Sequence, residues 1–188
     1  MGQVFGRAAA AGARGAIWYT LTDLLADPSR PNCADPYAWL SHGLLRSRYV
    51  AEAAAACPTP PLPGYRVNGD VEAKPSWQAL STAGRLLAGA SFERRLDFAE
   101  TGDLAVEAYR FRRPDGSALL LAFTDHGERL GKRGQEDLTA EWVLTPALLP
   151  GWTGRVRVTD YLGQVLQQSG ASIPVALDHR PRYVEVAP

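Results

Sequence analysis

The segment from Gly15 to Asp23, GAIWYTLTD, constrains the fold more than any other part of the chain. It is a short apolar and aromatic run, with β-branched residues at Ile17 and Thr20. Neither alternating face of the run carries a charge, which predicts a strand from Ala16 to Thr22 that is covered on both faces, as in a parallel sheet. A helical pattern precedes it, and a long loop and a second helical pattern follow. This order is typical of a parallel β/α unit.

Both flanking helices have sequence signals of their own. Residues 1 to about 13 carry apolar side chains at helical spacing, namely Val4, Phe5, Ala8, Ala9 and Ala11. The alanines allow close packing against a sheet, and Gly12 and Gly15 supply the stop. The second helix is expected from Lys74-Pro75-Ser76 to about Leu87, because proline suits the first turn of a helix. Its apolar stripe is Trp77, Leu80, Ala83, Leu86 and Leu87.

Residues 24 to 73 form a long connection rich in proline, which removes backbone donors and disfavours helix. Both cysteines, Cys33 and Cys57, lie in it. One interpretation is a disulfide that closes this loop, which would imply an oxidising compartment, outside the cell or in the periplasm. The other is two free thiols. The sequence leaves both open, and with them the location of the parent protein.

From Ser91 onward the apolar pattern has a period of two. It predicts strands at Phe92–Phe98, Leu104–Arg113, Ala118–Thr124, Thr139–Thr145, Arg155–Tyr161, Gln164–Gln167, Ser172–Leu177 and Tyr183–Val186. Turns are expected at Pro114-Asp115-Gly116 and Leu162-Gly163. Short strands at regular spacing indicate an antiparallel sandwich. Its expected core side chains include Val106, Ala108, Phe111, Leu119, Leu121 and Phe123.

Composition excludes several classes of partner. The 188 residues hold 20 Lys plus Arg and 20 Asp plus Glu, so the net charge is zero. Nucleic acid and anionic membranes are therefore not expected partners. No apolar run approaches the ~20 residues of a membrane helix. The first fifteen residues lack a signal-peptide pattern and resemble the middle of a helix, which predicts a chain that is truncated or started late.

Three motifs in order carry a family resemblance: Gly-Ala-Ile-Trp-Tyr-Thr-Leu-Thr-Asp, then His-Gly-Leu-Leu, then Lys-Pro-Ser-Trp-Gln-Ala-Leu. Together they resemble the C-terminal end of clan A glycoside hydrolases of the β-xylosidase and endoglucanase kind. The resemblance implies an α+β chain: the terminal β/α unit of an incomplete TIM barrel followed by an antiparallel β-sandwich. Residues 1–90 would be the barrel remnant, with the last helix before strand 8, strand 8, a long loop and helix 8. Residues 91–188 would be the sandwich.

The same resemblance implies what the chain lacks. Such enzymes use two carboxylates on the fourth and seventh barrel strands, and both would lie upstream of Met1. A whole barrel also needs ~250 residues. The chain is therefore expected to be a C-terminal fragment, acting on carbohydrate in the intact parent and inactive alone, with an upstream barrel half as its partner. The alternative is a carbohydrate-binding or protein-interaction β-sandwich module.

Few residues stand out as candidates for contact with substrate. Trp18 matches the eighth-strand Trp that such enzymes place under the sugar. Asp23, His42, Glu52 and Glu72 are interpreted as loop or solvated residues. An aromatic sugar platform on the sandwich could be built from Trp142, Trp152 and Tyr161, although strand aromatics more often pack in the core.

No nucleophile elbow, phosphate loop, dinucleotide fingerprint or metal-ligand spacing is present, so no catalytic residue, metal or cofactor is predicted. The sugar, its linkage, the stereochemical outcome and the oligomeric state cannot be inferred from the sequence.

Overall fold

A computed structural model describes residues 2–13, 45–47, 71–124 and 138–187. The chain forms two compact units, Met1–Ala16 with Ala79–Pro188, and Ile17–Gln78. Within the second unit, β1 (Leu45–Ser47) and β2 (Val71–Ala73) form an antiparallel pair in which Arg46 lies opposite Glu72.

Two helices lie where the sequence predicts them. Helix α1 spans Gly2–Ala10 and helix α3 spans Pro75–Leu87. On α3 the buried side chains include Ala83 and Leu86 of the predicted stripe, with Ala79 and Thr82 beside them. Helix α1 differs from the expected pattern, because Val4 is exposed and Gly6 is its buried residue.

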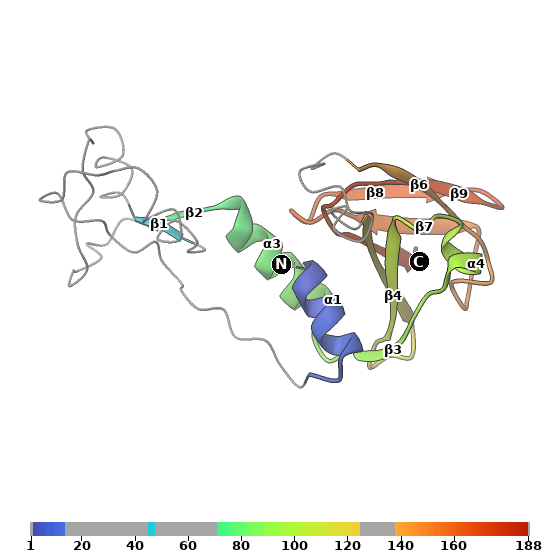
Figure 1. Cartoon of the computed structure of the whole chain (residues 1–188), viewed down its shortest axis with the longest axis horizontal. Coiled ribbons are helices and arrows are strands. Elements are labelled where there is room, and N and C mark those ends of the chain that lie inside the picture. The colour runs from blue at the N-terminus through green and yellow to red at the C-terminus, as the bar shows by residue number, and fades with distance from the viewer. Residues whose placement is uncertain (1, 14–44, 48–70, 125–137, 188) are drawn as a thin grey trace, which may run out of the picture. The chain divides into compact units, whose positions relative to one another are not determined.

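Within the described residues from Ser91 onward, eight antiparallel strands follow, close to the predicted ranges. Their order along the first sheet is β3-β4-β5-β10-β7-β8, and β6 and β9 form a second sheet. Figure 1 shows β6 and β9 next to each other. The bounds are β3 Ser91–Arg95, β4 Val106–Arg112, β5 Ala118–Thr124, β6 Ala140–Leu144, β7 Arg155–Thr159, β8 Val165–Ser169, β9 Ile173–Leu177 and β10 Arg182–Val186.

One hydrophobic core lies between the two sheets. Even-numbered residues of β6 and odd-numbered residues of β9 face it, as period-two alternation requires. The largest of them, Trp142, is 0% exposed and lies opposite Val175. From the larger sheet the core receives Ala108, Leu120 and Val184. The predicted antiparallel β-sandwich is therefore present.

A second hydrophobic cluster covers the other face of the larger sheet. It joins Tyr109, Phe111, Leu119, Leu121, Phe123 and Tyr183 to Ala83 and Leu86 of α3, with Phe5 and Ala9 of α1 packed against it. All seven residues of β5 are buried as a result. The six expected core residues are buried too, but they are divided between the two clusters.

Helix α1 approaches the sheet at Gly6. A Cβ atom on Gly6 would lie 2.9 Å from Leu121 Cδ2 and 3.0 Å from Tyr109 Cδ2. Any larger side chain would therefore push the helix or these two side chains away. Because Gly6 has no side chain, the backbone of α1 can lie close to Tyr109 of β4 and Leu121 of β5.

Two local features complete the sandwich. The predicted turn after β4 is present, with Gly116 at φ +83° and its N–H donating to Arg113 O (2.9 Å). The range Phe92–Phe98 is not one strand. Strand β3 ends at Arg95, and Asp97 caps a short helix, α4 (Phe98–Thr101). Its capping box with Glu100 is a signal that the strand prediction overlooked.

The barrel part of the predicted fold stays a prediction. The segment around Trp18 lies outside the described residues. The domain division at residue 90 also stays a prediction, and the structure adds that helices on its N-terminal side pack on the sandwich sheet.

Substituting Gly6 and Gly84 by Ala should change the free energy of unfolding in opposite directions. Gly6→Ala places a methyl group against Leu121 and Tyr109, and we expect a loss of about 1 kcal/mol in the free energy of unfolding, after allowing for alanine's better helix propensity. Gly84 on α3 has nothing within 4 Å of its added Cβ, so Gly84→Ala should stabilise by about 0.5–1 kcal/mol. Urea denaturation measures both. Equal stabilisation would show that α1 does not approach the sheet this closely.

Candidate functional site

The site residues predicted from the sequence lie outside the described part of the chain. Trp18, the predicted sugar-contacting residue, is one of them, and Cys33 and Cys57, the predicted pair of thiols or disulfide, are the others. Asp23, His42 and Glu52 also lie there. Their roles stay predictions.

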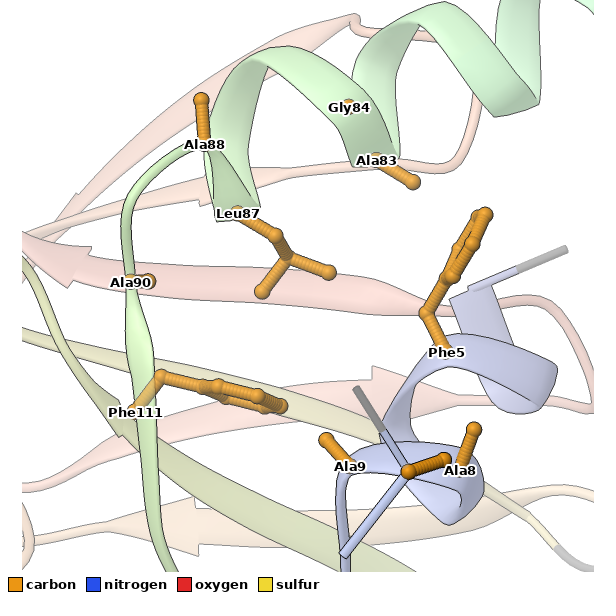
Figure 2. Close-up of a pocket in the computed structure, with 10 residues that line it drawn as sticks. Phe5, Ala8, Ala9, Ala83, Gly84, Leu87, Ala88, Ala90 and Phe111 are labelled. Carbon is orange, nitrogen blue, oxygen red and sulfur yellow. The ribbon is translucent and has the colours of Figure 1, made fainter. Parts of the chain in front are cut away.

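An apolar hollow of about 320 Å³ lies between α1 and α3. Figure 2 shows Phe5 and Leu87 directed into the space between the helices and the Phe111 ring directed into the same space. The remaining lining is alanine and glycine, including Ala83 and Gly84. No titratable side chain lines this hollow, so it has no group for acid–base chemistry.

A second hollow of about 450 Å³ lies beside α4 and β6. Two carboxyl side chains line it, Glu100 and Glu141, together with Thr101, Val143 and Thr145. Paired carboxylates are the groups that glycoside hydrolysis requires, so this hollow is the candidate for a local catalytic cleft within the described residues.

The environment of Glu100 does not suit a general acid. Arg94 donates two hydrogen bonds to its carboxylate, each 2.6 Å long. These hydrogen bonds lower the pKa of Glu100. Burial has the opposite effect on this pKa, but the hydrogen bond that the Asp97 N–H donates to Glu100 (3.1 Å) lowers it further. A general acid in a glycosidase needs a raised pKa, so that it is protonated when it meets substrate. Glu100 is instead an ionised residue that caps a helix.

Trp142 packs in the core, as strand aromatics more often do, and does not contribute to the alternative of an aromatic sugar platform. Its ring is fully buried between the sheets, and its Nε1–H donates to Glu100 O (3.2 Å). Trp152 packs against the same core, and the Arg180 guanidinium lies 5.8 Å from the Tyr161 ring centroid. The physical reason is the position of Trp142 on the inner face of β6, where period-two alternation directs it into the core.

A buried charge lies on the opposite face of the larger sheet. Glu107 on β4 is 2% exposed, and Arg7 on α1 donates to both of its carboxylate oxygens, at 3.0 and 2.6 Å. The Tyr109 hydroxyl donates to the same carboxylate. The Arg7 guanidinium also lies 5.3 Å from the centroid of Phe123, the residue opposite Glu107 across the strand pair. The bidentate geometry orients α1 on the sheet.

Several effects set the pKa values in this Arg7–Glu107–Tyr109 cluster. Burial by itself would raise the pKa of Glu107, but the hydrogen bonds from Arg7 and Tyr109 and the Arg7 charge outweigh it and lower the pKa below 4.5. Burial and the bond to Glu107 raise the pKa of Tyr109. Both residues therefore keep fixed protonation states near neutral pH. The cluster joins a helix to a sheet and has no group prepared for proton transfer.

Within ranges 2–13, 45–47, 71–124 and 138–187, no group of three or more His, Cys, Asp or Glu is placed to hold a metal ion. No helix in these ranges is long and apolar enough to cross a membrane.

Comparison with solved structures identifies the fold. The chain is similar to a family 39 glycoside hydrolase from the gut symbiont Bacteroides cellulosilyticus WH2, with a TM-score of 0.61 and 19% sequence identity. The match covers 99% of this chain and 29% of that protein. This chain has a glycoside-hydrolase-like fold.

A second solved structure is similar to a smaller part of this chain. A Bacillus halodurans C-125 protein, provisionally assigned as an α-N-acetylgalactosaminidase, matches with a TM-score of 0.40 and 14% identity over 59% of this chain and 24% of its own. No family model and no curated protein match the sequence. The chain thus spans less than a third of the glycoside hydrolase that it resembles in structure.

Glu107→Gln should reduce stability in a pH-dependent way. The folded-state pKa of Glu107 is lowered, so the stability it contributes is present above the unfolded value of 4.5 and is lost as the pH falls toward the folded value. We expect a loss of about 2 kcal/mol at pH 7, and a smaller difference from wild type at pH 3. Glu141→Gln, at an exposed residue of β6, is the matched control. A difference at pH 3 as large as that at pH 7 would contradict this account of the cluster.

Proposed function

We propose that this chain is the C-terminal fragment of a glycoside hydrolase that acts on O-glycosidic bonds in the intact parent, and that it does not catalyse hydrolysis alone. One observation carries the proposal: 99% of this chain matches part of a glycoside hydrolase in structure. The match covers only 29% of that protein, so the other 71% of it has no counterpart in this chain. The three motifs between Gly15 and Leu80 support the same origin.

The local chemistry supports the inactive state of the isolated chain. The two carboxyl side chains that line the hollow beside α4 and β6 are Glu100 and Glu141. Because Arg94 holds Glu100 as a carboxylate with a lowered pKa, Glu100 does not supply the proton that departure of the sugar's leaving group requires. The proposed catalytic carboxylates belong to an upstream barrel half, and Trp18 would contact the sugar once that half is present.

The purified chain should release no 4-nitrophenol from aryl xylosides or glucosides above the rate in buffer. Variants Glu100→Gln and Glu141→Gln provide the matched test, because each removes one carboxylate from the hollow. Turnover by the wild-type chain that is lost in either variant would contradict the proposal. A second observation tests the origin: the DNA upstream of Met1 should carry an in-frame sequence with further barrel motifs.

The alternative of a carbohydrate-binding module is tested separately. Burial of Trp142 removes one ring of the predicted platform, so we expect unchanged mobility of the chain in affinity electrophoresis on xylan, glucan and mannan. Retardation on one of these polysaccharides that is abolished by Trp152→Ala would favour the binding module instead.

A further inference from the structure

Strand β8 forms one edge of the larger sheet. Among the strands that the structure describes, it pairs with β7 alone. Backbone hydrogen bonds at the two ends of the β7–β8 pair show which residues of β8 point toward β7. The Asp160 N–H donates to Gln164 O, and the Gly170 N–H donates to Gly154 O, both at 2.9 Å. Because bonding direction alternates along an antiparallel strand, the even-numbered residues bond to β7. The residues that direct N–H and C=O groups to the open edge are Val165, Gln167 and Ser169.

The two edge strands of this sheet differ in how well they are protected from pairing with another chain. Strand β3, at the other edge, carries a register shift between Phe92 and Arg94 and three charged residues. Glu93 in this strand pairs with Arg110 at 2.7 Å and with Arg112. Charges and irregularities of this kind prevent an edge from pairing with another chain. Strand β8, with the sequence VLQQS, has no charge, proline or glycine.

Side chains of β8 are also left uncovered within the described structure. Val165 is 53% exposed and Leu166 is 58% exposed, on opposite faces of the strand. Leu166 lies opposite Val158, a residue of the core between the two sheets. The face of β8 that carries Leu166 is therefore on the same side of the sheet as this core. On that same face, the Gln168 Oε1 atom is buried and has no hydrogen-bond partner. An additional strand would cover both apolar side chains and could bring a donor to Gln168.

We propose that β8 pairs with β8 of a second copy of this chain, antiparallel about a two-fold axis at Gln167. In this register the outward groups of both strands meet, giving about six backbone hydrogen bonds. Gln167 faces Gln167 of the second copy, and Val165 faces Ser169. The two Gln168 residues lie diagonally opposite each other, with their backbones about 7–8 Å apart. At this separation the side-chain amide N–H of one copy can donate a hydrogen bond to the unpaired Oε1 atom of the other.

Charge favours a second copy as the occupant. The chain has no net charge, and β8 itself has none, so two copies meet without long-range or local repulsion. The paired edge is only five residues long, so the buried area falls below that of a standard stable interface. The association is accordingly weak, with a dissociation constant on the order of 100 µM.

Sedimentation equilibrium from about 10 µM to 1 mM tests the proposal. The wild-type chain should show a concentration-dependent monomer–dimer equilibrium. Leu166→Lys places a charge at the edge and should raise the dissociation constant at least tenfold. Gln167→Pro, which removes an N–H that β7 does not use, should do the same. Val143→Lys is the matched control, because Val143 is a similarly exposed strand residue, 45%, on the other sheet, and it should leave association unchanged.

Hydrogen exchange locates the interface. The backbone amides of Val165, Gln167 and Ser169 should exchange more slowly at high than at low protein concentration, while circular dichroism checks that each variant keeps its fold. A chain that is monomeric throughout the range would overturn the proposal. So would a dimer whose strength is the same in Leu166→Lys as in wild type, or one that Val143→Lys weakens equally.

Discussion

Burial of strands β4 and β5 on both faces is the constraint on which the rest of the structure depends. Odd-numbered residues such as Leu121 pack under α1 and α3, and even-numbered residues such as Leu120 pack against the smaller sheet. If either face of such a strand lost its covering layer, large apolar side chains would be exposed to water. The helices are therefore part of the packed unit that contains the sandwich, and the sandwich needs them to cover its outer face.

Within this arrangement, one buried carboxylate orients the first helix. Apolar packing alone would hold α1 on the sheet in several positions, because contacts among alanines are not directional. The bidentate pair of Arg7 and Glu107 and the close approach at Gly6 select one of them. Breaking such a pair is costly, because it leaves a charge in an apolar environment. Specific orientation of α1 thus comes from a small number of polar contacts placed inside a large apolar interface.

Charged side chains elsewhere on the larger sheet serve the same structural purpose. Glu185 pairs with Arg113 and Arg157, and Glu93 pairs with two arginines of β4. Because these arginines are engaged across strands, they do not form a basic surface for a polyanion. These ion pairs on the larger sheet therefore stabilise the pairing of its strands.

Except for the range Phe92–Phe98, which ends in α4, the sequence alone determined the approximate strand positions, helices α1 and α3 and the turn at Gly116, because alternation, helical spacing and glycine are local signals. It could not show that Phe111 and Ala108 belong to different cores, since both are simply apolar residues of one strand. Nor could it pair Arg7 with Glu107, a hundred residues away. Those outcomes depend on which face of each strand meets which layer, and long-range packing alone decides that.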